Sequence, residues 1–505
     1  MAMRVAFLAA ECEPWAKTGG LADVVDALAR ALGRIDGTPV GQVDVYLPRY
    51  RGVEPPAAAR RTSIRVPDPT ARTGLTELTV VDIAADGYRL RLVDHPAAFD
   101  RDGFYGGDSG DYRDNAWRFG LFCRAALETI RHDAEPIDVL HLHDWHASPA
   151  SIFRDLRYRD DPAIARLAVV HTLHNLAYRG WTPLDRLGDL GLGPGDVAPD
   201  AATDRFDLLR AGVERAELVN TVSRGFAAEA LTPAFGRGLD GTLQSLGDRF
   251  FGILNGIDSA IWDPASDTAL AATYSRSDRS GKDACRADLL ARLGFDAATP
   301  GPVIGMVGRL DPQKGFDLLA SATPALLERG ARIVVQGDGQ RVLADPFRAL
   351  VAANPGRVAL VERFDRAMAR RIYAGSDLFV MPSRFEPCGQ GQMIALRYGT
   401  PPIVRRTGGL ADSVRDDAET PGHGTGFTFD PPTPEALLAA CDRAIALHAR
   451  GGTAWAGLVD RGMAVDFDWV RGSAPDYVDA YRRAIGIRRG TAGADGPPPA
   501  RIRAD

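Results

Sequence analysis

Lysine is rare in this chain, and two of its three lysines stand in glycine-containing loops. The sequence has three lysines against 57 arginines; Lys17 lies in KTGGLADV and Lys314 in GRLDPQKGFD. An ammonium on a flexible stem acts as a point charge, and glycine lets the backbone approach a ligand closely. Both loops follow predicted strands, so we interpret the two lysines as phosphate contacts. Lys282 lies in a polar stretch and is expected to be a solvated surface residue.

The segments around Lys314 and Glu386 add further groups that could act on a phosphate-rich ligand. Arg309 shares the loop of Lys314, and together they could neutralise charge on a leaving diphosphate without a metal. Glu386 precedes Pro387-Cys388-Gly389 after a predicted strand, which places a carboxylate beside backbone amides able to receive phosphate oxygens. An ordinary surface turn at 308–317 and a carboxylate that only stabilises a helix start are the plainer alternatives.

Histidines are concentrated in one part of the chain. Five of the nine lie between residues 141 and 174, namely His141, His143, His146, His171 and His174. The spacing allows a metal site, but we favour the polar lining of a cleft, with buried core histidines as a third alternative. Asp144 falls at the carboxyl end of a predicted strand, where ligands bind in open α/β sheets.

Short apolar runs alternate with longer amphipathic segments, which predicts βα units around parallel sheets and an α/β fold. Strands are predicted at 4–10, 42–47, 78–83, 88–93, 137–142, 167–173, 217–222, 250–254, 302–307, 331–336, 357–361, 377–381 and 401–404. Helices are predicted at 21–33, 115–131, 316–328, 366–374, 434–448 and 474–485. The hexapeptide TGGLAD occurs at 18–23 and again at 407–412, which indicates two similar halves.

Composition excludes several classes of function. The formal net charge of −6 argues against a nucleic-acid or anionic-membrane binder. The sequence has neither an apolar run of about 18 residues nor the pattern of a signal peptide. Five scattered cysteines fit a reducing compartment, so a cytoplasmic location is expected. The glycine loop after the first predicted strand, at Lys17–Gly20, is neither Gly-x4-Gly-Lys-Ser/Thr nor Gly-x-Gly-x-x-Gly, so a nicotinamide dehydrogenase loses its main support.

Seven motifs together resemble the bacterial glycogen synthase and plant starch synthase family. They are KTGGLADV, HLHDWH, HNLAYRG, NGID, GRLDPQKG, FEPCG and YGTPPIVRRTGGLAD. The resemblance implies a GT-B fold, with two Rossmann-like domains facing a central cleft. It implies retaining transfer of glucose from ADP-glucose to the non-reducing end of an α-1,4-glucan such as glycogen, with no cofactor and no metal. The expected domains are 1–248 and 249–488, the second ending in a helix that returns to the first, followed by a disordered tail at 489–505.

The resemblance also implies roles for individual residues. Lys17, Arg309 and Lys314 would hold the ADP phosphates. Glu386 would position the sugar and favour positive charge at its anomeric carbon, and Asp144 would lie on the acceptor side. The remaining residues implied to act in substrate binding or catalysis are Gly19, Gly20, His174, Asn175, Asn255, Phe364, Cys388 and Gly389.

Some residues depart from the family pattern, so the sequence does not decide which nucleotide the donor sugar carries. Gln390 and Gly391 stand where Leu-Thr is usual, and Phe364 and Phe99 stand where tyrosine is common. A UDP-glucose-using or other α-glucan transferase is therefore one alternative, and a non-catalytic glucan-binding relative is another. A metal-dependent transferase and a pyridoxal-phosphate phosphorylase are disfavoured, because no Asp-x-Asp follows a buried strand and few lysines are available.

Overall fold

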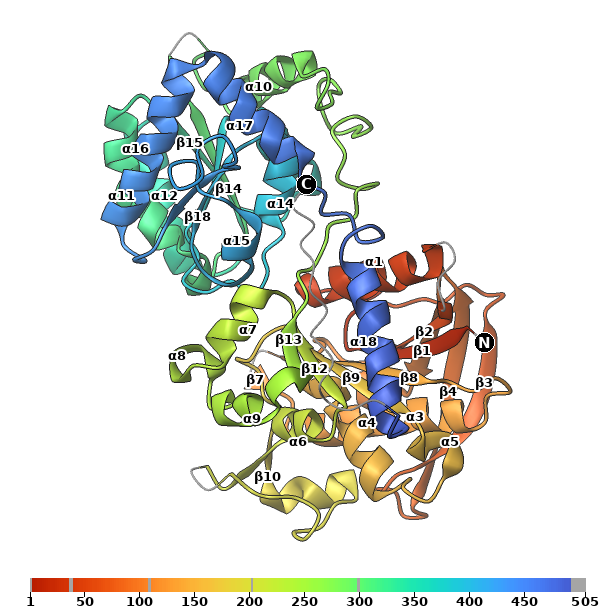
Figure 1. Cartoon of the computed structure of the whole chain (residues 1–505). Coiled ribbons are helices and arrows are strands. Elements are labelled where there is room, and N and C mark those ends of the chain that lie inside the picture. Colours follow the sequence, from red (N-terminus) through yellow and green to blue (C-terminus); the bar gives the residue numbers. More distant parts are fainter. Residues whose placement is uncertain (1, 36–39, 108–109, 201–202, 298–299, 492–505) are drawn as a thin grey trace. The chain divides into compact units, whose positions relative to one another are not determined.

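The chain forms two compact units. The computed structural model describes residues 2–35, 40–107, 110–200, 203–297 and 300–491 (Figure 1). The first unit comprises the residues up to Val222, Ala227–Ile253 and the segment from Trp469 onward; the second comprises Ser223–Phe226 and Leu254–Asp468. Most of the predicted tail, residues 492–505, lies outside the described residues. No helix among the described residues is long and apolar enough to cross a membrane.

A nine-stranded sheet runs through the first unit. Its order is β13 (Phe250–Gly252), β12 (Leu218–Thr221), β9 (Ala168–Leu173), β8 (Val139–His143), β1 (Met3–Leu8), β2 (Val40–Pro48), β5 (Arg89–Asp94), β4 (Leu75–Ala84) and β3 (Arg60–Pro67). The strands from β13 to β5 are parallel, as predicted. Their apolar residues are buried on both faces, which explains the continuous apolar runs.

The far edge of this sheet differs from the prediction. β4 pairs antiparallel with both β5 and β3. Only residues 85–88 join β4 to β5, which is too short for a crossover, so the two strands must form a hairpin. β3 was not predicted, because its sequence RRTSIRVP is mostly polar and most of it is exposed at the sheet edge. Charged residues on such an edge discourage pairing with another chain.

Helices in the first unit follow the strands. They are α1 (Gly20–Arg34), α2 (Pro96–Phe99), α3 (Asn115–Arg131), α4 (Asp144–Leu156), α5 (Pro162–Ala165), α6 (Leu208–Glu214), α8 (Pro233–Gly236), α9 (Asp240–Ser245) and α18 (Ser473–Arg488). α7 (Arg224–Ala230) is divided, with its residues up to Phe226 in the second unit and the rest in the first. Short 3-10 helices lie at η1 (Leu184–Leu190) and η2 (Gly247–Arg249), and two small antiparallel pairs are formed by β6 (Gly106–Gly107) with β7 (Gly110–Asp111) and β10 (Trp181–Pro183) with β11 (Arg205–Asp207). The apolar positions of α1 recur with helical spacing and are buried.

The last helix packs on the first sheet although it is far away in sequence. α18 lies beside α1, β8 and β9 (Figure 1). Asn220 of β12 donates to the Tyr477 hydroxyl at 3.2 Å, and the Tyr481 hydroxyl is 2.8 Å from His141 Nδ1. β13 also belongs to the first sheet, so this unit extends to Ile253, beyond the predicted boundary at residue 248.

The second unit contains a six-stranded, fully parallel sheet. Its order is β16 (Val358–Val361), β15 (Arg332–Gln336), β14 (Val303–Val307), β17 (Leu378–Met381), β18 (Pro402–Arg405) and β19 (Phe427–Phe429). Of the six strands of this sheet, only β19 was not predicted, because its three residues are too few to show a strand pattern. The helices are α10 (Ser280–Arg292), η3 (Pro312–Lys314), α11 (Phe316–Glu328), α12 (Arg341–Ala353), α13 (Arg366–Gly375), α14 (Gly391–Arg397), α15 (Gly408–Ser413), α16 (Pro434–Arg450) and α17 (Gly452–Ala464).

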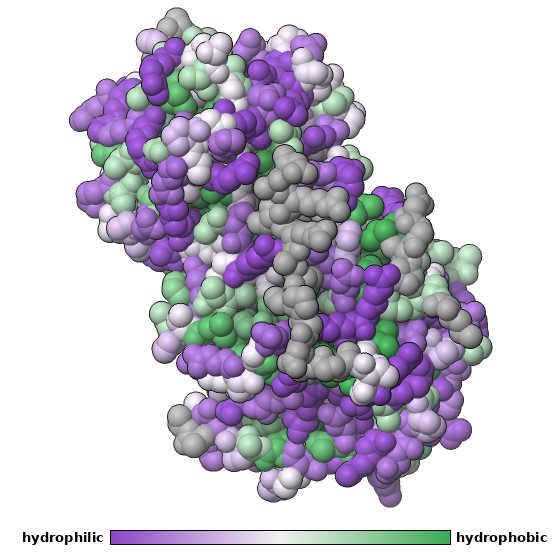
Figure 2. Space-filling view, viewed as in Figure 1, coloured by the Kyte–Doolittle hydropathy of each residue, from purple (hydrophilic) through white to green (hydrophobic). Residues whose placement is uncertain are grey.

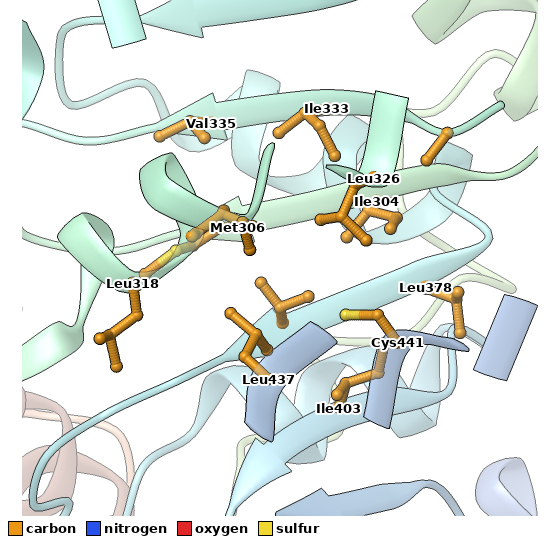
Figure 3. Packing of buried hydrophobic residues seen from close by; sticks show 14 of the residues in the cluster. Ile304, Met306, Leu318, Leu326, Ile333, Val335, Leu378, Ile403, Leu437 and Cys441 are labelled. Atoms are coloured by element: carbon orange, nitrogen blue, oxygen red, sulfur yellow. The ribbon is translucent and has the colours of Figure 1, made fainter. Parts of the chain in front are cut away.

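A contiguous apolar core joins this sheet to its helices. Figure 3 shows Leu326 of α11 and Leu437 and Cys441 of α16 over sheet residues that include Ile304 and Ile403. All five are fully or almost fully buried. The outer face visible in Figure 2 is mainly hydrophilic, with scattered small hydrophobic areas. The α/β pattern read from the sequence is thus confirmed in both units.

Lys282 is not the solvated residue that its polar surroundings suggested. Its ammonium donates to the carbonyl oxygens of Ala374 and Tyr398, at 3.0 Å each, and to Thr400 Oγ1 at 2.7 Å. Burial lowers the pKa of Lys282 to about 8. The residue therefore ties α10 to the end of α13 and to the turn before β18.

We expect Lys282→Met to lower the free energy of unfolding by about 2–4 kcal/mol, because it removes the donor of three hydrogen bonds. The Tyr398 carbonyl keeps the Tyr274 hydroxyl as a second donor, so the main loss falls on Ala374 and Thr400. Lys282→Arg should also destabilise, since a planar guanidinium cannot reproduce the three contacts. Urea denaturation measures this, with Asp283→Asn, on the exposed neighbour, as control. Equal stability of wild type and Lys282→Met would contradict the assigned role.

Candidate functional site

Three neighbouring parallel strands of the first unit end at the same edge of the sheet. β1, β8 and β9 are adjacent, and Leu142 pairs with Leu8 on one side and His171 on the other. Glu11 lies soon after β1, Asp144 directly follows β8, and His174 directly follows β9. The geometry therefore brings together groups from three separate segments of the sequence, at the edge where α/β sheets bind ligands.

Asp144 is held in an unusual conformation at this edge. Its φ of 55° lies in the left-handed region, which residues other than glycine rarely adopt, although aspartate and asparagine enter it more readily than most. Its carboxylate accepts a hydrogen bond from the backbone N–H of His174 at 2.8 Å, and its carbonyl oxygen is 3.1 Å from His171 Nε2. Burial raises the pKa of Asp144 to about 7; backbone N–H groups oppose the rise, and the charge of Glu11 adds to it. Such a rigid, proton-poised carboxyl is typical of functional sites.

The histidines divide into core and site residues. His141 is fully buried, with Thr172 Oγ1 2.6 Å from Nε2 and the Tyr481 hydroxyl 2.8 Å from Nδ1. It is a satisfied core histidine, so the expected cleft lining is wrong for this residue. His143 Nδ1 lies 3.0 Å from His174 Nε2. Burial lowers the pKa of His174 to about 3, which leaves a neutral imidazole.

Metal-binding geometry is not formed by these histidines. Within the described ranges, no group of three or more His, Cys, Asp or Glu side chains could hold a metal ion. His146 instead stacks between the rings of Trp145 and Tyr105, with centroids at 4.0 and 4.6 Å. The cluster therefore consists of neutral, packed imidazoles.

The KTGG loop, residues 17–20, leads into α1, which begins at Gly20. The Lys17 ammonium pairs with Asp23 of α1 and lies 3.5 Å from Glu13. A Cβ placed on Gly19 or Gly20 would meet no atom within 4 Å. The open space beside both glycines would admit a ligand close to the backbone, next to the ammonium.

Two groups at this edge were missed by the sequence reasoning. Glu11 is 4% exposed, and its carboxylate accepts hydrogen bonds from Thr18, Gly19 and the Tyr105 hydroxyl. An acidic residue just after a fully apolar strand was the available signal for Glu11. Tyr105 lies in an irregular segment and gave none. Phe99, which stands where the family often has tyrosine, is fully buried in the core.

In the second unit, Lys314 and Glu386 form a close ion pair. The Lys314 ammonium lies 2.9 and 2.7 Å from the two Glu386 carboxylate oxygens, and Ser383 donates to Oε2 at 3.0 Å. Lys314 ends η3 after β14, and Glu386 follows β17, the strand next to β14. Adjacent parallel strands thus bring together two motifs separated by 72 residues. Arg309 is more exposed, with Asp311 at 4.0 Å.

The second copy of TGGLAD supports the loop that carries Glu386. A Cβ on Gly408 would lie 2.1 Å from the Glu386 carbonyl oxygen, and one on Gly409 would lie 2.3 Å from the Cys388 carbonyl oxygen. Gly409 also donates its N–H to the Glu386 carbonyl at 3.1 Å. These glycines permit close backbone packing, whereas Gly19 and Gly20 of the first copy border open space. The same hexapeptide therefore has two physical roles.

Of the remaining predicted residues of the second unit, Asn255 and Cys388 are buried and Phe364 is exposed. Asn255 is buried, and its Oδ1 has no hydrogen-bond partner among the described residues. Cys388 is buried, which raises the pKa of its thiol, and Gly389 has a φ of 73°. Phe364 is 70% exposed, with the Arg366 guanidinium 5.8 Å from its ring centroid.

Asn175 lies in the loop after β9. Its side-chain oxygen accepts a hydrogen bond from the backbone N–H of Ala177 at 2.9 Å. This contact folds the loop that also supplies the His174 amide to Asp144. Asn175 is therefore placed to shape the loop that borders Asp144.

Comparisons with known proteins agree over almost the whole chain. The family model of the starch synthase catalytic domain matches residues 4–245, and that of glycosyl transferases group 1 matches residues 301–446. Glycogen synthase from Syntrophotalea carbinolica is 41% identical, covering 96% of this chain and 99% of the relative. Glycogen synthase from Anaeromyxobacter dehalogenans (strain 2CP-C) is 43% identical, covering 95% and 99%.

A solved structure of a starch synthase also matches this chain over nearly its whole length. The catalytic domain of starch synthase IV from Arabidopsis thaliana, bound to ADP and acarbose, superposes with a TM-score of 0.86 at 33% identity, covering 96% of this chain and all of that one. The chain belongs to the bacterial glycogen synthase and starch synthase family, and it is a retaining glycosyltransferase with the GT-B fold.

Proposed function

We propose that this chain transfers glucose from ADP-glucose to the non-reducing end of an α-1,4-glucan, with retention of configuration, in glycogen synthesis. The observation that best supports this assignment is the contact between Lys314 and Glu386, because it places a phosphate-binding cation next to a carboxylate suited to the sugar. The similarity to glycogen synthases along the whole chain supports the reaction, and the ADP in the starch synthase IV structure favours adenine over uracil.

In this proposal the second unit binds the donor. Lys314 and Arg309 neutralise the charge that grows on the departing ADP, a role that metal ions fill in other transferases. Glu386 faces the sugar and stabilises positive charge at the anomeric carbon. The exposed ring of Phe364 stacks on the base, while Asn255, Cys388 and Gly389 border the sugar and phosphates. No cofactor is required for these steps.

The first unit supplies Lys17 to the diphosphate and Asp144 to the acceptor glucan. Open space at Gly19 and Gly20 lets this loop approach the donor. His174 is a neutral imidazole that can exchange hydrogen bonds with sugar hydroxyls, and Asn175 lies beside it. The bond between the anomeric carbon and the phosphate oxygen breaks while a bond to the acceptor hydroxyl forms on the same face. The departing phosphate takes the hydroxyl proton, so no protein nucleophile is needed.

We also place the protein in the cytoplasm. All five cysteines are unpaired and buried, which fits a reducing compartment. The assay that tests the proposal compares ADP-glucose with UDP-glucose on glycogen and records product stereochemistry. Faster transfer from UDP-glucose would make the departures at Gln390, Gly391 and Phe364 the basis of a different nucleotide preference.

Lys314→Ala and Arg309→Ala should each lower kcat/KM for ADP-glucose by a factor on the order of 10²–10³, because each removes a cation from the departing diphosphate. Steady-state kinetics on folded protein measure the effect. Arg329→Ala, which removes a surface arginine paired with Asp442, is the control and should change kcat/KM by less than about threefold. A similarly small change in either loop variant would remove that residue from the proposed role.

Asp144→Asn should stabilise the fold at pH 8 although it lowers activity. The carboxyl pKa is 3.8 when unperturbed and about 7 in the fold, so the folded chain retains a proton between these values that the unfolded chain releases. The free energy of unfolding therefore falls as pH rises from 3.8 to about 7 and stays lowered above it. Asparagine avoids this cost and tolerates left-handed φ.

The expected gain for Asp144→Asn is about 1–3 kcal/mol at pH 8 and close to zero near pH 4. Urea denaturation at several pH values measures it, and kcat at pH 8 should fall on the order of 10-fold or more. Glu54→Gln, on an exposed residue, is the control. A difference between Asp144→Asn and wild type that does not change with pH would contradict the assigned protonation.

A further inference from the structure

Glu11 receives an unusual number of hydrogen bonds for a single side chain. Oε2 accepts from the backbone N–H groups of Thr18 at 2.7 Å and Gly19 at 3.0 Å. Oε1 accepts from the Thr18 hydroxyl and the Tyr105 hydroxyl, both at 2.6 Å. A carboxylate has room for about four such donors, so this buried group is fully occupied by the protein. Its partners come from two segments far apart in sequence.

These bonds determine which groups of the KTGG loop can meet a ligand. The amides of Thr18 and Gly19 point to Glu11, so they are not available to a phosphate. The Lys17 ammonium and the open space beside Gly19 and Gly20 remain. A negative charge beside a diphosphate-binding loop is unfavourable for binding, so its presence requires a compensating benefit. Fixing the loop is a benefit that four charge-assisted hydrogen bonds can provide.

The same carboxylate connects the loop to the end of β8. Tyr105, bound to Oε1, stacks on His146. Burial raises the pKa of the Tyr105 hydroxyl, and the charges of Glu11 and Asp144 add to the rise. The charge of Glu11 also acts on Asp144. Glu11 is therefore in contact with one side of the site and electrostatically coupled to the other.

We propose that Glu11 is a positioning residue that holds residues 17–20 in the conformation in which Lys17 contacts the donor diphosphate. The proposal rests on the proposed function for the identity of the donor. It predicts that loss of the Glu11 charge weakens donor binding, whereas glucan binding is little affected. A residue that only supported the fold would weaken both together with stability.

The test compares Glu11→Gln, Tyr105→Phe and the exposed control Glu54→Gln. Glu11→Gln keeps the size of the side chain. Its amide N–H₂ replaces a carboxylate oxygen, however, so a donor then faces the N–H or O–H donors that the oxygen accepts from. We expect it to weaken ADP binding, measured by calorimetry, on the order of 10-fold, and to lower kcat/KM for ADP-glucose on the order of 30–300-fold. KM for glycogen should stay within about threefold of wild type. Tyr105→Phe removes one of the four donors and should have less than about one third of the effect on ADP affinity.

ADP affinity of Glu11→Gln within about threefold of wild type would overturn the proposal. A parallel loss of ADP affinity, glycogen KM and melting temperature would overturn it as well, because it would mean a general structural role. If wild-type protein fails to use ADP-glucose, the proposed function fails, and the comparison of ADP affinities still tests Glu11 independently.

Discussion

A carboxylate buried away from water must be met by hydrogen-bond donors or cations, and three such groups lie at the candidate sites of the two units. Glu11, Asp144 and Glu386 are each less than 9% exposed, and each lies just beyond the carboxyl end of a buried strand. Glu11 is met by loop amides and hydroxyls, Asp144 by the His174 amide, and Glu386 by Lys314 and Ser383. Each carboxylate thereby fixes a loop that the sheet alone would leave unspecified.

Each of the three lysines lies where its compact ammonium meets several oxygens at once, and arginine is a poor substitute there. Lys314 reaches both oxygens of Glu386, Lys17 lies between Asp23 and Glu13, and Lys282 meets three neutral oxygens. A compact ammonium fits such convergent sites, whereas a guanidinium is broad and planar. The third lysine was assigned to the surface only because its sequence neighbours are polar. The lesson is that lysine in an arginine-rich chain marks a geometric requirement, whether for a ligand or for the fold.

Most parallel strands and six of the helices could be predicted, because apolar runs and helical periodicity are local signals that burial produces directly. The 13-residue helices α4, α10, α12 and α17 were not predicted. β3 and β19 could not be predicted, one being polar at a sheet edge and the other only three residues long. At the site, Lys314 and Glu386 were recognised from their motifs, but their contact depends on strand order. The burial of His141 depends on α18, which begins at Ser473, and no local pattern contains it. The two copies of TGGLAD look alike in sequence and differ only in what surrounds them.

In the proposed function Lys314 binds the phosphate and Glu386 the sugar, although the two side chains pair with each other. Removing the charge of Glu386 should then leave the ammonium freer for phosphate. The direct measurement is ADP affinity by calorimetry together with kcat for Glu386→Gln. The account predicts ADP binding as tight as in wild type or tighter, with kcat lowered on the order of 10² or more. Loss of ADP affinity in proportion to kcat would contradict it, because Glu386 would then act mainly by holding the phosphate site together.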